Sequence, residues 1–398
     1  MKILFLLSRF PYPLTKGDKL RAFNQMKYLA EENDIYLFCL NQTSFRKHKT
    51  AFPDNQTALK FSFLKGLKIC NFNLWDACFG MFKSILNRTP LQAGFYTHNR
   101  HIRIFERHIN EIKPDLIYVQ FVRMAEYCRN VKVKKALDFQ DALSANMLRR
   151  SKISNPCLKI ILRREAELLR DYEVKMLDFF DLTTIITAAD RREIASEARD
   201  KIIISGNGID NSYFQQTETE DKKYDVVFCG NMSYAPNVDA AKYLIKSVMP
   251  LVWARYPQVK VLIAGANPKT CVRRLASERV EVSGYVEDMK QCYAQSKIFV
   301  AALRTGSGLQ NKLLEAMAIG TPVICSSLAN NALEATDGKH LLVANGTSQY
   351  ANLILKLLTD HSLQQLLTSN ALNFVKLNYN WRKICQNLTK EFQNLIKK

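Results

Sequence analysis

The amino-acid sequence predicts an α/β protein made of two doubly wound domains, each a parallel sheet covered by helices. The chain has 398 residues, more than a single hydrophobic core usually organises. Short apolar runs alternate with amphipathic helical stretches from one end to the other, and this alternation favours parallel sheets. The polar stretch 215–223 interrupts the pattern and is predicted to link two domains.

The first domain is expected to span residues 1–214 and the second residues 224–379, with a final helix over 380–398. Each predicted strand is a short apolar run rich in β-branched or aromatic residues. In the first domain these runs are 2–7, 35–40, 68–72, 116–119, 135–139, 182–187 and 201–205; in the second they are 224–229, 259–264, 280–282, 298–302 and 322–325.

The composition is that of an ordinary globular protein, 47% hydrophobic and 24% charged, which excludes disordered and low-complexity architectures. The 10 cysteines include no C-x-x-C pair, so reduced thiols are expected. No apolar run approaches the roughly 18 to 20 residues that cross a bilayer, and the N-terminus lacks a signal-peptide pattern. We therefore expect a cytoplasmic protein, with peripheral attachment to the inner face of the cytoplasmic membrane left open.

The net charge is +20, and a field of this strength attracts nucleic acid, anionic lipid or phosphorylated substrates. Residues 1–135 hold 23 Lys and Arg against 10 Asp and Glu, so the first third is the basic part. The sequence contains no nucleic-acid-binding module, so no nucleic-acid partner is predicted.

The segment 61–86 combines bulky apolar residues with lysines. Apolar residues at 74, 75, 78, 79, 82, 85 and 86 fall on one helical face. Such a face suits a helix in an anionic membrane interface, and equally a helix packed on a sheet. Packing in the core is the preferred interpretation.

The segment 303–324 carries the most chemical information, because a glycine turn separates a predicted strand from a helix. Gly306 and Gly308 allow backbone N–H groups to approach a ligand at a helix N-terminus, where the helix dipole favours phosphate. Arg304 and Lys312 add positive charge on either side of the turn. Glu315 can offer its carboxylate to the hydroxyls of a bound ribose.

The same segment resembles the E-x7-E region of glycosyltransferase family 4, whose members have the GT-B fold. The pattern R-x-G-x-G-x-x-x-K-x-x-E from Arg304 to Glu315 resembles a subset of surface-polysaccharide enzymes. Other matching stretches follow in family order: 205–210 (SGNGID), 228–230 (FCG), 236–239 (PNVD), 282–286 (VSGYV), 337–343 (DGKHLLV) and 380–381 (NW).

The resemblance implies two Rossmann-like domains facing a cleft, with the second domain binding a nucleotide diphosphate-sugar and the final helix returning to the first. The donor-binding residues that it implies are Gly17, Gly230, Asn231, Tyr285, Val286, Gly306, Ser307, Gly308, Leu309 and Glu315. Ser307 replaces the first Glu of the family pattern, and the usual cation pair falls near Asn231 and Asn237. Arg304 and Lys312 are therefore expected to supply the positive charge.

In the first domain, Gln140 and Asp141 follow a predicted strand at the position where many relatives carry a His. The Asp141 carboxylate either orients or deprotonates an acceptor hydroxyl, or caps the following helix. Arg123 either meets a phosphorylated acceptor or is solvated, and solvation is preferred. The histidines lack a metal-binding arrangement, and His98 with His101 is read as surface, so no metal or cofactor is expected.

The resulting expectation is a retaining glycosyltransferase of hexosyl or N-acetylhexosaminyl type, with Arg304, Lys312 and Asp141 as catalytic residues. Its acceptor would be the hydroxyl of a growing, lipid-linked cell-surface glycan. Two alternatives stay open: a nucleotide-sugar 2-epimerase with the same fold, and an inactive scaffold of a polysaccharide complex, which Ser307 suggests.

Overall fold

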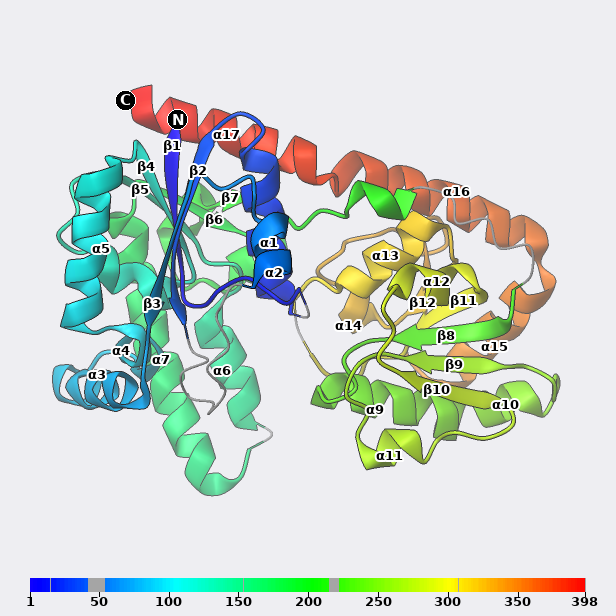
Figure 1. Cartoon of the computed structure of the whole chain (residues 1–398). Helices are drawn as coiled ribbons and strands as arrows, with labels where there is room; N and C mark the ends of the chain where they lie inside the picture. Colours follow the sequence, from blue (N-terminus) through cyan, green and yellow to red (C-terminus); the bar gives the residue numbers. More distant parts are fainter. Residues whose placement is uncertain (15, 42–53, 153, 215–221, 307, 398) are drawn as a thin grey trace. The chain divides into compact units, whose positions relative to one another are not determined.

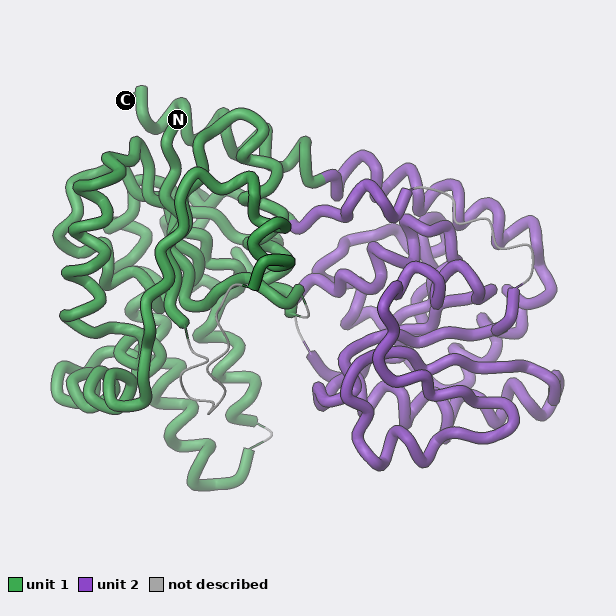
Figure 2. Tube along the Cα trace, in the orientation of Figure 1, with its two compact units in different colours: residues 1–206, 381–398 green, residues 207–380 purple. Residues whose placement is uncertain are grey.

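The computed structural model describes residues 1–14, 16–41, 54–152, 154–214, 222–306 and 308–397. The chain divides into two compact units, shown in Figure 2: unit 1 is Met1–Gly206 with Trp381–Lys398, and unit 2 is Asn207–Asn380. Each unit is an α/β domain with a parallel sheet (Figure 1). The predicted fold class is confirmed.

Unit 1 contains a seven-stranded sheet in the order β3-β2-β1-β4-β5-β6-β7. Every pairing is parallel, with Ile3 of β1 opposite Ile35 of β2 and Leu116 of β4. The central strands are buried on both faces, which explains their continuous apolar sequences. The strands are β1 (Lys2–Leu7), β2 (Asp34–Asn41), β3 (Gly66–Asn71), β4 (Leu116–Gln120), β5 (Lys134–Asp138), β6 (Leu182–Ile185) and β7 (Ile203–Ile204).

Helices cover both faces of this sheet (Figure 1). The last helix, α17 (Trp381–Lys397), belongs to unit 1: Trp381 is 1% exposed, and the Phe392 ring lies 5.2 Å from that of Tyr118 in β4. The other helices are α1 (Gly17–Leu29), α2 (Asn55–Lys60), α3 (Leu74–Asn87), α4 (Leu91–Tyr96), α5 (Asn99–Ile112), α6 (Leu143–Lys152), α7 (Pro156–Phe179) and α8 (Ala188–Glu193).

The preferred interpretation of the segment 61–86 is wrong for α3. Phe61 is buried and packs on Phe10 and Phe23, but the large apolar face of α3 is exposed. The residues that α3 buries are Asp76, Ala77, Gly80 and Ser84. This small face lies so close to α4 that a Cβ at Gly80 would be 2.0 Å from the Gly94 carbonyl oxygen.

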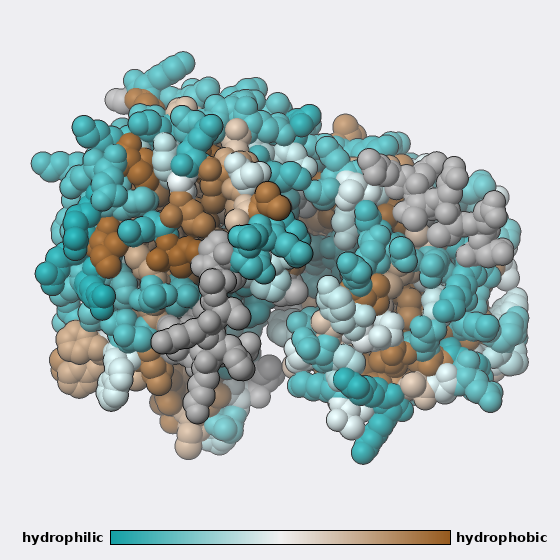
Figure 3. All heavy atoms as spheres, in the orientation of Figure 1, coloured by the Kyte–Doolittle hydropathy of each residue, from teal (hydrophilic) through white to brown (hydrophobic). Residues whose placement is uncertain are grey.

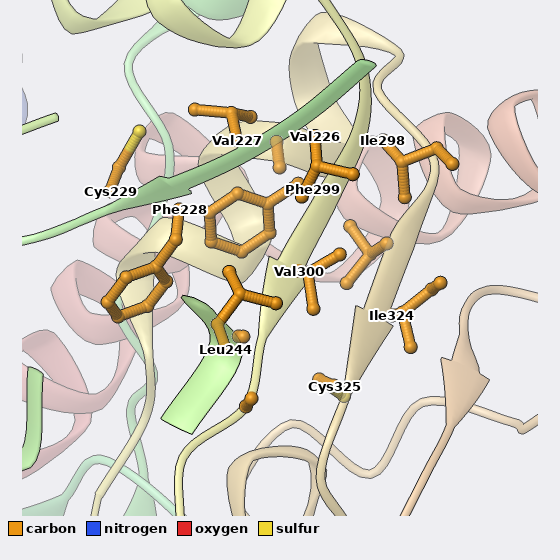
Figure 4. Close-up of a cluster of buried hydrophobic side chains, with 14 of the residues drawn as sticks. Val226, Val227, Phe228, Cys229, Leu244, Ile298, Phe299, Val300, Ile324 and Cys325 are labelled. Carbon is orange, nitrogen blue, oxygen red and sulfur yellow. The ribbon is translucent and has the colours of Figure 1, made fainter. Parts of the chain in front are cut away.

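Unit 2 contains a six-stranded parallel sheet in the order β10-β9-β8-β11-β12-β13. Its core is apolar throughout, with Phe228, Leu244 and Phe299 packed between the strands and helices (Figure 4). The strands are β8 (Tyr224–Cys229), β9 (Val261–Ala264), β10 (Val280–Gly284), β11 (Ser296–Ala301), β12 (Val323–Cys325) and β13 (Leu342–Val343).

Residues 207–214, which the sequence analysis placed in the first domain, lie in unit 2. The Ile209 backbone N–H donates to the Tyr379 carbonyl at 2.7 Å, and Phe214 packs against the unit 2 core. The helices of this unit are α9 (Ala235–Tyr243), α10 (Met249–Trp253), α11 (Thr270–Arg273), α12 (Met289–Ala294), α13 (Asn311–Ile319), α14 (Ser327–Asn330), α15 (Thr347–Thr359) and α16 (His361–Asn378).

Both sheets reverse their strand order at one point, between β1 and β4 in unit 1 and between β8 and β11 in unit 2. Ligands of open α/β sheets bind beyond the carboxyl ends of the strands at such points. The residues that follow these four strands are therefore the first place to look for a site.

Among the described residues, no helix has the length and apolarity needed to span a membrane.

Candidate functional site

The reversal point of unit 2 lies between Gly230, which follows β8, and the turn that follows β11. Here the backbone is tightly packed: a Cβ at Gly265 would be 1.8 Å from the Gly230 carbonyl oxygen, and a Cβ at Gly230 would be 2.7 Å from the Asn237 amide nitrogen. Position 265 therefore requires glycine for steric reasons, and a side chain at position 230 would displace the Asn237 amide. The Asn237 amide donates to the Asn231 carbonyl at 3.0 Å and so fixes the loop after β8.

The turn after β11 leads into the N-terminus of α13. Gly306 has φ of 116° and Gly308 φ of 76°, conformations that L side chains rarely adopt. Ser307 lies outside the described residues. The backbone is thus shaped by glycine where α13 begins, and a helix N-terminus offers N–H groups and a positive dipole end to an anion.

Lys312 stands in the first turn of α13 with its chain over the Phe228 ring. Its Nζ donates to Asn237 Oδ1 at 2.6 Å, and no ion-pair partner is found for it in the described part of the chain. Burial lowers the pKa of Lys312 to about 8. A desolvated cation whose hydrogen bond goes to a neutral amide is suited to pairing with an anionic ligand.

Arg304 differs from Lys312, although the sequence analysis treated the two as a pair. Its guanidinium is exposed, lies over the Tyr243 ring and donates through Nε and Nη2 to the Asp239 carboxylate. The hydrogen bond to Asp239 raises the pKa of Arg304. The charge of Arg304 is therefore compensated within unit 2.

Glu315 lies one turn after Lys312 and is half-buried. Its Oε2 accepts a hydrogen bond from the Tyr293 hydroxyl at 2.8 Å. Burial raises the pKa of Glu315, while the hydrogen bond from Tyr293 and the charge of Lys312 oppose that shift. Tyr293 is completely buried, so it fixes the position of the carboxylate.

The other donor-binding candidates lie at the same edge of the sheet. Tyr285 is 71% exposed and follows β10, two strands away from β8; Val286 beside it packs partly on the core. Leu309 also packs on the core next to the glycine turn. This edge of unit 2 thus combines a cation, a glycine turn, a carboxylate and an exposed aromatic ring.

In unit 1, Asp141 follows β5. Its Oδ2 accepts from the Asn146 side-chain amide at 2.8 Å, while Oδ1 is buried without a hydrogen-bond partner among the described residues. Burial, helped by the negative charge of Asp190, raises the pKa of Asp141 to about 7. Glu173 accepts a hydrogen bond from the Ser144 backbone N–H in the first turn of α6, and no capping hydrogen bond to Asp141 is found among the described residues.

Arg123 follows β4 on the same edge of unit 1 and is not the solvated side chain that we preferred. Its guanidinium lies 4.0 Å from the Phe121 ring centre and 5.0 Å from that of Tyr96. Nη2 donates to Ser8 Oγ at 3.2 Å, and the buried Nε has no partner among the described residues. Burial lowers the pKa of Arg123, which marks a desolvated cation.

The backbone around these two groups is constrained. Phe121 has φ of 68° and Gln140 φ of 63°, and such values in residues other than glycine are often found at functional sites. The Gln140 amide donates to Gln120 Oε1 at 3.2 Å, so Gln140 supports the floor of the site. Gly17 begins α1 on this edge, but a Cβ there would meet nothing within 4 Å.

The described residues contain one group that could hold a metal ion, formed by Asp76, His98 and His101. His101 is 2% exposed, so its assignment to the surface is wrong. Its Nε2 lies 3.0 Å from the Asn71 carbonyl oxygen, and Asp76 Oδ2 accepts from the Asn73 backbone N–H. These contacts already give the group a structural role at the start of α3.

Comparison with known proteins places these observations in a family context. Residues 223–360 match the model of the group 1 glycosyl transferases. Over the whole chain, a sucrose-phosphate synthase from Thermosynechococcus elongatus superposes with a TM-score of 0.71 at 14% identity, covering 100% of both chains. The chain has the GT-B fold.

Two further GT-B structures were solved with nucleotides. Anabaena HepE, in complex with UDP and glucose, has a TM-score of 0.68 at 16% identity and covers 99% of this chain and 100% of its own. A mutant of S. aureus TarM, in complex with Fondaparinux, α-GlcNAc-glycerol and UDP, has a TM-score of 0.68 at 13% identity, with 100% of both chains covered.

The curated relatives match only in part. An uncharacterized protein in the cps region of Klebsiella pneumoniae is 24% identical over 177 residues, 42% of this chain and 45% of its own. An uncharacterized glycosyltransferase of Methanocaldococcus jannaschii is 31% identical over 103 residues, 25% of this chain and 26% of its own. The chain thus matches less than half the length of these relatives.

Within this GT-B chain, sequence reasoning missed the partners of the candidate residues. Asn237 and Asp239 occur in the matching stretch 236–239, yet their roles as partners of Lys312 and Arg304 depend on tertiary contacts between α9 and the segment that follows β11. Tyr293 lies in α12, and no sequence pattern connects it to Glu315. The Asp190 carboxylate, which affects Asp141, was likewise not identified.

Proposed function

We propose that the protein is a retaining glycosyltransferase that moves a hexosyl or N-acetylhexosaminyl group from a nucleoside diphosphate-sugar to a glycan hydroxyl. The observation that carries this proposal is Lys312, a half-buried and largely desolvated cation beside the glycine turn at the reversal point of unit 2. A diphosphate supplies the negative charge that such a cation lacks. The family match over residues 223–360 and the UDP complexes of HepE and TarM support this choice of donor.

The local geometry supports the donor contacts that we propose. The diphosphate lies against the backbone of Gly306, Gly308 and Leu309 and the Nζ of Lys312, near Gly230 and Asn231. Glu315, oriented by Tyr293, accepts hydrogen bonds from the ribose hydroxyls. Tyr285 and Val286 border the space for the base.

The reaction breaks the bond between the anomeric carbon and the β-phosphate oxygen and forms a bond from that carbon to the acceptor oxygen. Negative charge develops on the departing diphosphate, and Lys312 with the backbone N–H groups stabilises it. The departing phosphate oxygen takes the acceptor proton. Retention is inferred from the resemblance of 304–324 to family 4, and the anomeric configuration of the product tests it.

Asp141 belongs to unit 1, where we propose that the acceptor binds. With a pKa of about 7, its carboxyl group is partly ionised at neutral pH and can orient the acceptor hydroxyl through a hydrogen bond, while the departing phosphate oxygen takes the proton. Arg123 gives the same edge a desolvated cation, which fits an acceptor carrying a phosphate group. A growing glycan linked through diphosphate to a lipid at the inner face of the membrane combines both features, and the K. pneumoniae relative in a cps region supports polysaccharide synthesis.

The proposal is tested by thermal unfolding of the purified chain with a panel of nucleoside diphosphate-sugars, followed by product analysis. A ligand at 100 times its Kd stabilises by about 2.7 kcal/mol, which is easily measured. We expect one donor to stabilise the chain and to be converted to its nucleoside diphosphate in the presence of a glycan acceptor. Epimerisation of the free donor would favour the 2-epimerase instead, and donor binding without turnover would favour a scaffold.

A further inference from the structure

The exposed surface of unit 1 carries an unusual concentration of large apolar side chains. On α3 most of the helix face opposite α4 is apolar and exposed, with Trp75 84% exposed and Phe79 and Phe82 60% each. The remaining members of this α3 face are Leu74, Ile85 and Leu86. A helix that buries alanine, glycine and serine while exposing tryptophan and phenylalanine is not explained by the packing of unit 1.

A second apolar region lies where α6 passes into α7. Leu148, Leu158, Ile160 and Ile161 are exposed there, Ile160 by 71%. Residues 142–164 contain six Lys and Arg and no Asp or Glu. We call this region the α6–α7 tip; Figure 3 shows apolar side chains at the corresponding lower end of unit 1.

Both regions lie at the carboxyl edge of the unit 1 sheet. The helix α3 begins three residues after β3 ends, and α6 begins five residues after β5 ends. The helix α7 has 24 residues and is therefore about 36 Å long, whereas a strand of five residues spans about 17 Å. Since α7 returns to the start of β6, its first turns project beyond the carboxyl edge (Figure 1).

The two regions are held together by α4. The Glu165 carboxylate of α7 accepts hydrogen bonds from the Leu91 and Gln92 backbone N–H groups, both at 2.9 Å, at the start of α4. The helix α4 in turn packs on the small face of α3. The α3 face and the α6–α7 tip are thus fixed parts of one unit.

We infer that the α3 face and the α6–α7 tip together bind an anionic lipid bilayer. The positive charge near the α3 face favours an anionic bilayer as the binding partner. Residues 77–105 also contain four Lys and Arg and no acidic residue. Exposed Trp and Phe beside cations are what an interfacial helix needs. A protein partner would require a matching acidic surface, whereas anionic lipids supply negative charge over the whole plane.

The biological role of this membrane binding rests on the proposed function. Membrane binding would bring the carboxyl edge of the unit 1 sheet, which carries Asp141, close to the bilayer surface where a lipid-linked acceptor would lie. Its physical basis is independent of catalysis. Binding to vesicles requires neither a donor nor an acceptor.

The experiment is sedimentation of the full chain with vesicles of phosphatidylcholine alone or with 30% phosphatidylglycerol. We expect binding to the anionic vesicles and its decrease with added salt, since cations near the surface are screened. The triple variant Trp75→Ser, Phe79→Ser, Phe82→Ser should bind about 100-fold more weakly, because it removes the buried apolar area. The control is Leu366→Ser with Leu377→Ser, two exposed leucines of unit 2, which should bind as the parent does.

The contribution of the positive charges at the α6–α7 tip is tested by a separate variant with its own control. Arg150→Gln with Lys152→Gln and Arg163→Gln, all exposed, should remove most of the preference for anionic vesicles. Lys242→Gln with Lys246→Gln and Arg255→Gln in unit 2, also exposed, should leave that preference intact.

Three results would overturn the inference: no binding to anionic vesicles, equal binding by the α3 triple variant, or a lipid-free dimer of the parent chain that this variant converts to a monomer. The last result would show that a second copy covers the face. Stabilisation of the variants by a nucleoside diphosphate is measured in parallel. If a nucleoside diphosphate stabilises the chain but anionic vesicles do not bind it, the membrane inference is wrong and the proposed function stands. If vesicles bind but no nucleoside diphosphate stabilises the chain, the proposed function is wrong and the membrane inference stands.

Discussion

The two reversal points of the molecule have the same topology and opposite chemistry. In unit 2, glycines at positions 230, 265, 306 and 308 shape the backbone near Lys312, a half-buried cation. In unit 1, side chains occupy the corresponding edge: Phe121 and Gln140 take left-handed conformations, and Asp141 and Arg123 are desolvated.

This contrast fits the proposal that unit 2 binds the donor and unit 1 binds the acceptor. A backbone shaped by glycine suits the diphosphate of a nucleoside diphosphate-sugar, because N–H groups can contact its oxygens directly. An edge built of side chains suits an acceptor that differs between enzymes, because side chains can be replaced without refolding the strands. The predictions that follow change one of the two edges at a time.

The largest effect is expected at Lys312. Charge accumulates on the diphosphate as the glycosidic bond breaks, so Lys312→Ala should lower kcat about 100-fold or more and raise the donor KM less. Steady-state kinetics measure both constants, with Lys242→Ala, an exposed lysine of the same unit, as control. A KM effect alone would mean that Lys312 acts only in the ground state.

Glu315→Gln should weaken donor binding by roughly 1.5 to 3 kcal/mol, the value of a hydrogen bond to a charged group. Calorimetric titration with the nucleoside diphosphate measures this change. Tyr293→Phe removes the hydroxyl that orients Glu315 and should give a smaller loss of the same kind. Unchanged binding by Glu315→Gln would remove this residue from the site.

The Asp141 carboxylate is expected to lower the stability of the chain at neutral pH while it contributes to activity. Its pKa of about 7 lies above the usual carboxyl value, so between about pH 4 and pH 7 the native state holds a proton that the unfolded state has lost. The free energy of unfolding therefore falls as pH rises through this window.

Asp141→Asn should accordingly raise the free energy of unfolding by about 1 to 2 kcal/mol at pH 8 and by almost nothing at pH 4. The same substitution should lower the rate of sugar transfer to the acceptor. Denaturant unfolding at both pH values tests this, with Asp171→Asn, an exposed acid on α7, as control. Equal stability of parent and variant at pH 8 would show that the carboxylate is not desolvated.

The smallest effect is expected at Arg304. Because Asp239 already compensates its charge, Arg304→Ala should change donor affinity less than about threefold, within the range of exposed ion pairs. The double variant with Lys312→Ala should then resemble Lys312→Ala alone. A loss of donor affinity as large as that caused by Lys312→Ala would instead show that Arg304 and Lys312 both contact the donor diphosphate.

The sequence predicted most of the fold because each central strand is a continuous apolar run, and such runs can be read directly from the chain. The glycine turn and Glu315 were also identifiable, since glycine spacing marks backbone geometry. The different states of Arg304 and Lys312 were not, because they depend on Asp239 and Asn237 of α9, which approach the segment after β11 only in the folded chain.

The exposed face of α3 shows the same limit. Its apolar periodicity predicts which side chains share a face, but the direction of that face was decided by Gly80 and Gly94, which allow α3 and α4 to touch through their small residues.

The central claim is that protonated Lys312 binds the diphosphate of the donor, and the pH dependence of UDP binding tests it most directly. With a pKa of about 8 in the free chain, Lys312 loses its charge as pH rises, so the association constant measured by calorimetry should fall about tenfold per pH unit above pH 8. Lys312→Arg keeps its charge in this range and should remove the decrease. A parent chain whose affinity for UDP is constant from pH 7.5 to about 9.5 would contradict the account.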